Sequence, residues 1–154
     1  MALKNRREMD PKFQWKLSDI FETQAAWEQA FQNAKKAVDT LGALEGTLKQ
    51  SPQQLKAGLD QIYAATQQVE LVYLYANLFK SGDNGDPEAQ RLEGRAMSLY
   101  VALSTALSFV DPEILSIPKA ELDAWLRLPE LQEYRHILED TDRMRPYSLP
   151  KEQE

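Results

Sequence analysis

Apolar residues recur at steps of three and four positions through three long stretches of this 154-residue chain. Such steps place side chains on one face of an α-helix, because a helix turns once in about 3.6 residues. The six glycines and eight prolines are expected between these stretches, where they would start or end helices. Alternating β-branched runs, which would indicate strands, are absent from the sequence. The pattern therefore predicts an all-α fold.

The first long helix is expected to begin at Thr23, whose hydroxyl can cap it, after a short turn near 18–21. It is expected to end before Gly42, since glycine commonly follows the last residue of a helix. Its apolar face would consist of Ala26, Trp27, Ala30, Phe31, Ala34, Val38 and Leu41.

The second and third long helices are predicted to form an antiparallel hairpin. A serine and a proline at 51–52 start the second helix, which runs through Phe79 to a turn at 81–86. An aspartate and a proline at 86–87 start the third, whose apolar pattern continues to Val110. Because the connection is short, the two helices should pack as antiparallel neighbours. The face of the second helix would hold Leu55, Leu59, Ile62, Thr66, Val69, Val72 or Tyr73, Ala76 and Phe79.

Shorter helices should complete an antiparallel helical bundle around 113–116, around 118–126, and from Pro129 to about Thr141. The buried side of the last would hold Leu131, Tyr134, Ile137 and Leu138. We expect one helical domain over residues 1–145 and a polar linker over 146–154.

The charge and composition exclude several classes of protein. The formal net charge is −6, and the basic residues are scattered apart from a group at 4–7, so nucleic-acid binding is not expected. No apolar run approaches the roughly 20 residues that cross a bilayer, so no membrane association is expected. Residues 1–8 lack the apolar core of a signal peptide, and cysteine is absent; both favour the cytoplasm.

A metal site is difficult to build from one histidine and no cysteine. The only ligand-like spacing is Glu133-x-x-His136, whereas a helical di-iron bundle needs two such motifs and two further glutamates. The buried stripe of this helix leaves both residues beside it, so a solvated histidine is the favoured interpretation. A carboxylate-bridged metal bundle is the least favoured of the functions considered.

Two acidic groups have equally simple interpretations. Glu139, Asp140 and Asp142 precede two arginines near a helix end, which favours locally paired surface charges over a catalytic carboxylate pair. The carboxylates at 83 and 86 lack the spacing of a calcium loop and predict a turn and a helix cap. No catalytic, cofactor-binding or metal-binding residue is therefore expected in this chain.

Aromatic residues indicate that the second helix has apolar groups on two sides. Tyr63, Tyr73 and Phe79 share this helix with Tyr75, which falls off the face of Tyr73 and Phe79. A helix of this kind usually packs against two neighbours. Both neighbours can lie in this domain, which is the favoured alternative, or one side can dock on a part of the protein outside this sequence. Such a docking face would also allow the isolated chain to form a homodimer.

Several segments, in this order, resemble the oligoendopeptidase F family. The entry segment Trp15-Lys-Leu-Ser-Asp-Ile-Phe21 is similar to the family pattern Trp-Asp-Leu-x-Asp-Ile-Tyr, from which Lys16 departs. Further similarities are Trp27 with Phe31, the turn at 44–48, the helix start at 51–55, Tyr73-Leu-Tyr-Ala76, residues 86–90, Ser108-Phe-Val-Asp-Pro-Glu-Ile114, Leu131 with Tyr134, and residues 143–149, where Tyr147 replaces a frequent histidine. The resemblance covers almost the whole chain.

The resemblance implies the N-terminal helical domain of a zinc peptidase of the thimet-oligopeptidase type. Such enzymes hold zinc with a His-Glu-x-x-His helix, and no His-Glu pair occurs here, so this chain alone is expected to be inactive. Zinc would then belong to a catalytic domain outside this sequence, and that domain and its oligopeptide substrates would be the partners. The implied role is a helical lobe beside the substrate channel. The alternative is a freestanding acidic helical module for protein–protein interaction.

Overall fold

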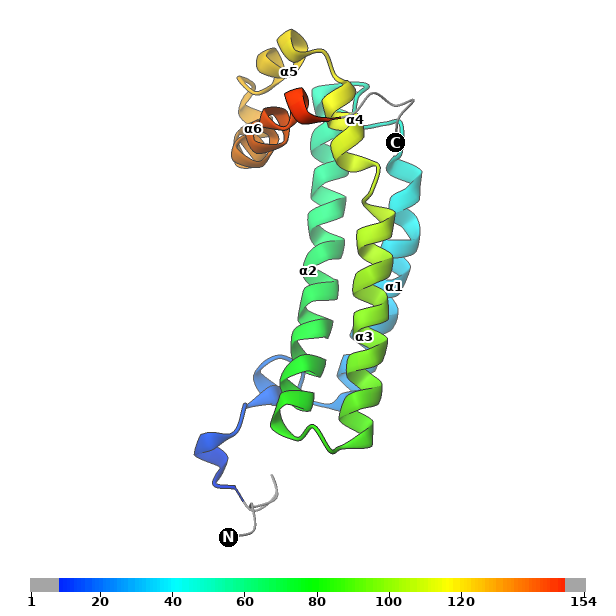
Figure 1. Ribbon diagram of the computed structural model, residues 1–154, viewed down its shortest axis with the longest axis vertical. Coiled ribbons are helices and arrows are strands. Elements are labelled where there is room, and N and C mark those ends of the chain that lie inside the picture. Colours follow the sequence, from blue (N-terminus) through cyan, green and yellow to red (C-terminus); the bar gives the residue numbers. More distant parts are fainter. Residues whose placement is uncertain (1–8, 149–154) are drawn as a thin grey trace. The chain divides into compact units, whose positions relative to one another are not determined.

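The computed structural model describes residues 9–148, in which α-helices and short 3-10 turns are joined by brief connections (Figure 1). The α-helices are α1 (Gln24–Leu41), α2 (Pro52–Gly82), α3 (Pro87–Ala106), α4 (Val110–Ser116), α5 (Lys119–Trp125) and α6 (Arg135–Arg143). The 3-10 turns are Pro11–Phe13, Leu17–Asp19, Gly42–Leu44, Pro129–Tyr134 and Arg145–Tyr147. Between residues 9 and 148 no strand occurs, which confirms the all-α prediction. The interpretations of residues 1–8 and of 149–154 lie outside the described residues.

The three long helices begin at the predicted capping residues. The Thr23 hydroxyl oxygen accepts a hydrogen bond from the backbone amide three positions later, at 3.1 Å, and Ser51 does the same at 3.1 Å. An Asp86 carboxylate oxygen accepts from the amide of Glu88 at 2.8 Å. Each side chain satisfies an amide that lacks a partner within its helix, which fixes where the helix starts.

The predicted end of α1 is confirmed, since the helix ends at Leu41, but Gly42 does not have the left-handed backbone that is typical of a glycine at this position. The chain passes from α1 directly into a 3-10 turn at Gly42–Leu44, and the glycine with a left-handed backbone is Gly46, with φ of 82°. Glu113 of α4 holds the turn that contains Gly46, because its carboxylate accepts from the amides of Gly46 at 2.7 Å and Lys49 at 3.2 Å. A partner far along the chain therefore decides the course of the chain after α1.

Apart from Gly82, the last residue of α2, two glycines lie inside helices, although the sequence pattern predicts glycines between them. Gly94 in α3 has open space where a Cβ would stand. Gly58 in α2 is different, because a Cβ there would overlap the side chain of Leu48, which is fully buried. The absence of a side chain at 58 thus allows the 44–50 turn to approach α2 closely.

The chain divides into two compact units that both use α2. Unit 1 contains the described residues up to Asp39 together with 64–105, and unit 2 contains 40–63 together with the described residues from 106 onward. Each unit therefore assembles segments that are distant in the sequence.

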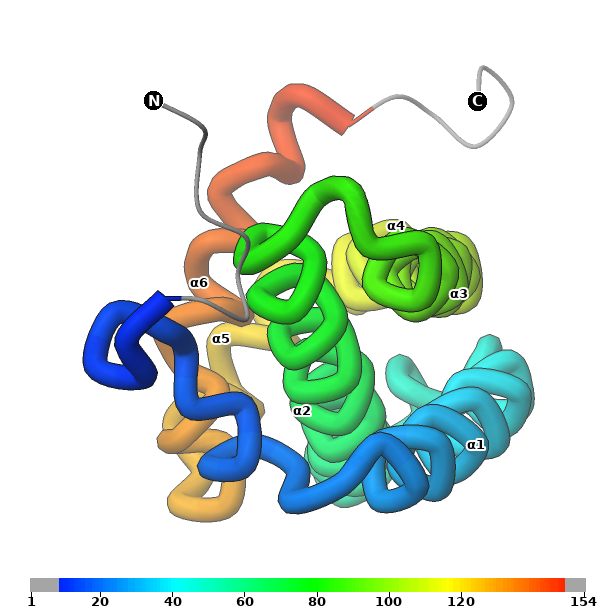
Figure 2. Tube along the Cα trace, turned by 90° about the horizontal axis from the view of Figure 1, so that it is seen from below, coloured from blue at the N-terminus to red at the C-terminus, as the bar shows by residue number. Residues whose placement is uncertain are grey.

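Unit 1 is built on α1, the C-terminal part of α2, and α3, which Figure 2 shows from one end. The Trp27 indole N–H, fully buried, donates to the carbonyl oxygen of Val72 at 2.9 Å. Arg95 of α3 lies over the rings of Trp27 and Phe31 and pairs with Glu28 at 2.6 Å. The hydrogen bond from Arg95 lowers the pKa of Glu28 to about 2. An aromatic cluster and a charged clamp thus join α1 to the hairpin.

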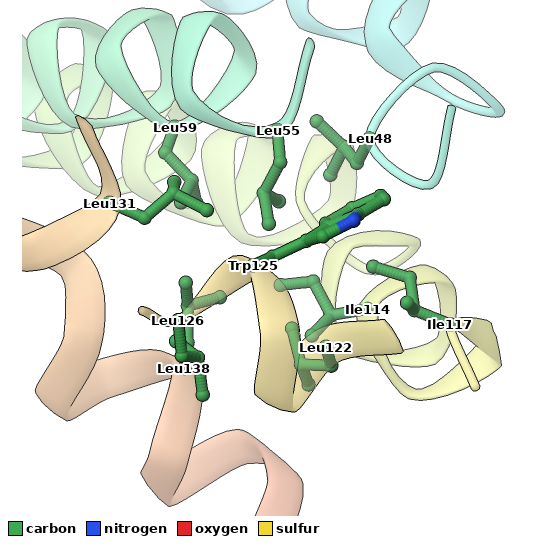
Figure 3. Close-up of a cluster of buried hydrophobic side chains, with 10 residues drawn as sticks. All are labelled: Leu48, Leu55, Leu59, Ile114, Ile117, Leu122, Trp125, Leu126, Leu131 and Leu138. Carbon is green, nitrogen blue, oxygen red and sulfur yellow. The ribbon is translucent and has the colours of Figure 1, made fainter. Parts of the chain in front are cut away.

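Unit 2 has its own apolar core, in which Trp125 lies among leucine and isoleucine side chains (Figure 3). Its buried members are Leu48, Leu55, Leu59, Ile114, Ile117, Leu122, Trp125, Leu126, Leu131 and Leu138. The predicted burial of Ile137 is wrong, since this side chain is 44% exposed while Leu138 is 1% exposed. Consecutive helical residues differ by roughly 100°, so burying Leu138 turns Ile137 outward.

Candidate docking surface

The Glu133-x-x-His136 spacing does not form a shared site. Glu133 pairs with Lys56 of α2 at 3.0 Å, whereas the His136 side chain is 87% exposed and its Nδ1 lies 3.0 Å from Asp140. The two residues therefore face different partners. Across residues 9–148, no group of three or more His, Asp or Glu side chains is placed to hold a metal ion.

The acidic group near the end of α6 is paired with neighbouring cations, as predicted. Asp140 contacts Arg143 at 2.6 Å, and Asp142 contacts both Arg145 at 2.8 Å and Lys119 at 2.9 Å. The hydrogen bond from Lys119 is the main cause of the lowered pKa of Asp142. These carboxylates are therefore paired with cations at the surface, as expected of solvated charges.

The turn between α2 and α3 also matches its predicted role. An Asp83 carboxylate oxygen accepts from the amide of Gly85 at 3.0 Å, and Asp86 caps α3. Both side chains satisfy backbone groups of the turn, which is the usual use of aspartate at such positions.

Unit 2 carries a polar network around a pair of stacked rings, Tyr63 and Tyr134, with centroids 5.4 Å apart. The Tyr134 hydroxyl donates to Asp60 at 2.6 Å, and Lys56 contacts the same carboxylate at 2.9 Å. Burial, followed by the hydrogen bond with Asp60, raises the pKa of Tyr134 to about 12. Tyr134 is therefore a hydrogen-bond donor at neutral pH, and the network joins α2 to the 129–134 turn.

A cavity of about 530 Å³ in unit 2 lies beside the turn that Glu113 holds. Its charged lining includes Glu45, Lys49 and Asp111 as well as Glu113. Glu113 is only 8% exposed, and its carboxylate already accepts hydrogen bonds from two backbone amides. That carboxylate has a structural role here, since both of its oxygens hold the turn.

Unit 1 carries an apolar groove of about 700 Å³ between α2 and α3. Leu71 and Leu74 of α2 are 43% and 44% exposed, and Met97 and Tyr100 of α3 are 40% and 44% exposed. Tyr73 lies beside Tyr100 with ring centroids 5.7 Å apart. These side chains form a continuous apolar surface across two neighbouring helices, which we call the α2/α3 groove.

The predicted face of α2 is buried at Leu55, Leu59, Ile62, Val69, Val72 and Ala76, but the buried side is wider than predicted. Tyr75, expected off the main face, is only 8% exposed and packs against Phe21, Trp27 and Phe79. The exposed apolar side carries Leu71 and Leu74 instead. The nearly unbroken apolar run over 71–76 is the sequence signal for this two-sided helix, although it does not tell which side is covered.

Among the described helices, none is by itself long and apolar enough to cross a membrane. Residues 87–116 and Lys119–Trp125 reach that length and apolarity only when taken together, across a bend of 102°.

Comparisons with known proteins give one consistent result. A family model described as Oligopeptidase F matches residues 113–154. The chain is 31% identical to oligopeptidase PepF of Bacillus subtilis over 99% of its own length, and 28% identical to group B oligopeptidase PepB of Streptococcus agalactiae over 97%. The structure of oligoendopeptidase-F from Enterococcus faecium matches 85% of the chain with a TM-score of 0.75 and 26% identity.

The match covers only part of each relative. This chain spans 23% of the Bacillus protein, 25% of the Streptococcus protein and 26% of the Enterococcus chain. It therefore corresponds to about a quarter of the length of the proteins that it resembles.

Proposed function

Since the chain is homologous to the N-terminal part of oligoendopeptidase F peptidases, we propose that it is the non-catalytic lobe of such an enzyme. In this role it helps to shape the channel through which oligopeptides reach the catalytic domain. The observation that carries the proposal is a match along nearly all of this chain to only a quarter of the relatives. The remaining length of a parent protein of that size is ample for the reaction centre.

The catalytic domain of the parent is the proposed partner, and that domain would hold the zinc ion. Zinc in such a site activates a bound water for attack on a peptide bond. The carboxylates described above cap a helix, pair with cations or accept from backbone amides, so they do not fit a zinc-binding role. We also propose a cytoplasmic location and oligopeptide substrates for the parent.

One observation favours a second candidate function. The α2/α3 groove gives this acidic chain an exposed apolar surface, which suits a freestanding module that binds a partner protein. The coding region distinguishes the two functions. A reading frame that continues into a His-Glu-x-x-His segment supports the peptidase lobe, whereas a stop codon with no such frame nearby supports the module.

The test is to mix the purified chain with the separately expressed remainder of its parent and to measure hydrolysis of unstructured peptides of increasing length. We expect the chain alone to be inactive and free of stoichiometric zinc. Adding it should change the rate or the length preference of the remainder. Peptidase activity with bound zinc in the chain alone would overturn the proposal. So would a remainder whose rate and length preference do not change when the chain is added.

A further inference from the structure

The α2/α3 groove lies on a side of unit 1 that α1 does not cover. Val72 and Tyr75 contact Trp27 of α1, so they mark the covered side of α2. Leu74 is two residues from both Val72 and Ala76, and two residues correspond to about 200° around a helix. Leu74 therefore points away from the buried side, and Leu71, one turn earlier in α2, lies on the same side of the helix.

The exposed apolar residues are spaced as in a helix–helix interface. Leu71 and Leu74 are three positions apart on α2, and Met97, Tyr100 and Val101 are at steps of three and four on α3. Two antiparallel helices with such residues along their seam present a groove that accepts the ridge of a further helix. The groove extends from Gln67 to Asn77, which corresponds to about 15 Å of α2, or roughly three turns.

The backbone around the groove favours a helix over an extended peptide. Residues 67–77 and 97–100 lie well inside α2 and α3, where amides and carbonyls bond to one another along the helix. The groove therefore offers no sheet edge to pair with an extended chain. An occupant must satisfy its own backbone groups, and an amphipathic helix does so.

Charge disfavours a second copy of this chain as the occupant. Each copy carries a formal net charge of −6, and Glu70 stands at the edge of the groove. If two copies packed groove to groove about a two-fold axis, their negative charges would lie close together. The relatives are about four times longer than this chain, so a parent of that size has ample length to supply a different helix.

We propose that the α2/α3 groove binds an amphipathic helix from the remainder of the parent peptidase, which packs against α2 and α3 as the fourth helix of a bundle with α1. This inference rests on the proposed function, because it requires a parent longer than this chain. The docked helix would present apolar residues at steps of three and four, with a basic residue opposite Glu70.

The absence of cysteine allows a direct test by thiol labelling. Leu74→Cys and Met97→Cys are prepared in this chain and in the undivided parent, whose other cysteines are replaced by serine. Ile137→Cys is the matched control, because Ile137 in unit 2 is as exposed as Leu74, at 44%. We expect maleimide to react at least tenfold more slowly at 74 and 97 in the parent, with little change at 137.

A second measurement uses binding of the separately expressed remainder. The double variant Leu71→Glu/Leu74→Glu should bind at least tenfold more weakly than the unaltered chain, whereas Ile137→Glu should bind normally. Circular dichroism checks that each variant keeps its helices, which is expected because the substituted side chains are exposed.

The outcomes separate this inference from the proposed function. If the remainder binds and alters hydrolysis while positions 74 and 97 stay fully reactive, the docking site is wrong and the peptidase lobe stands. If the remainder does not bind, both fall. Protection that rises with the concentration of the chain alone would identify a second copy as the occupant, and protection by a short apolar peptide would identify a peptide subsite; either overturns the docked helix.

Discussion

Gly58 and Gly94 both lie within long helices, yet their surroundings give them opposite roles. At Gly58, a side chain would collide with Leu48, which is fully buried and has little freedom to move. At Gly94, nothing lies within reach of an added Cβ. The first glycine is thus required by packing, whereas the second only weakens its helix.

We therefore predict opposite effects of one substitution at these two positions. Gly58→Ala should lower the free energy of unfolding by about 1–3 kcal/mol, because an overpacked core must shift. Gly94→Ala should raise it by up to about 1 kcal/mol, because alanine favours the helix and restricts the unfolded chain. Urea unfolding followed by circular dichroism measures both changes. Stabilisation by alanine at both positions would show that Leu48 moves aside at little cost.

Single residues with local roles could be predicted from the sequence, and residues with distant partners could not. Thr23 and Ser51 were identified as caps, because a cap bonds to an amide only a few positions later. The turn at 44–48 is expected from the family resemblance, but the residue that holds it, Glu113, could not be identified, because it is 67 positions from Gly46. The need for Gly58 likewise depends on a contact with Leu48 in a separate segment.

At the scale of elements, Glu113 joins α4 to the turn that follows α1. Its carboxylate is the acceptor for the amides of Gly46 and Lys49, and the residue is buried. Removing the acceptor would leave these donors without the partner that they have in the folded chain.

We expect Glu113→Ala to lower the free energy of unfolding by about 1–3 kcal/mol, because two backbone amides would lose their charged hydrogen-bond acceptor. Glu113→Gln should cost less, because its amide oxygen can still accept from one of them. Glu121→Ala in α5 is the control and should change stability by no more than about 0.5 kcal/mol, as an exposed substitution. Thermal unfolding compares the stability of the three variants. Equal losses of stability in Glu113→Ala and Glu121→Ala would show that the hydrogen bonds of Glu113 contribute little.

The faces of the helices could be predicted only in part. The stripe of α1 was identified correctly at Trp27, Phe31, Ala34, Val38 and Leu41, because polar residues separate these positions. In α2 the apolar residues occur on several sides, so the pattern did not show that Tyr75 is buried and Leu74 exposed. Neighbouring helices decide this choice, and they are not visible in one segment of sequence.

At the scale of the whole molecule, the division into two units has no sequence signal. One boundary falls between 63 and 64, inside the continuous helix α2, where neither proline nor glycine marks it. The predicted single domain over 1–145 stays a prediction, and the linker over 146–154 lies mostly outside the described residues. Contacts between distant segments define the units, so composition along the chain could not show them.

Because each unit has its own core, we expect a cavity in one core to destabilise mainly that unit. Leu92→Ala in unit 1 and Leu122→Ala in unit 2 each empty a fully buried site, at a cost of about 2–5 kcal/mol. Hydrogen exchange should accelerate chiefly in α1 and α3 for the first variant, and chiefly in α4, α5 and α6 for the second. A uniform acceleration in both variants would show that the whole chain unfolds in a single step.

The continuity of α2 through both units also has a consequence for the order of folding. The segment 64–105 belongs wholly to unit 1, and it separates the two parts of the chain that form unit 2. If unit 2 formed first, it would have to close this segment as a loop and lose the corresponding chain entropy. Pairing of α2 with α3 requires only the short turn at 83–86, and it brings positions 64 and 105 together. We therefore expect the hairpin to form first and to lower the entropic barrier for forming the core around Trp125.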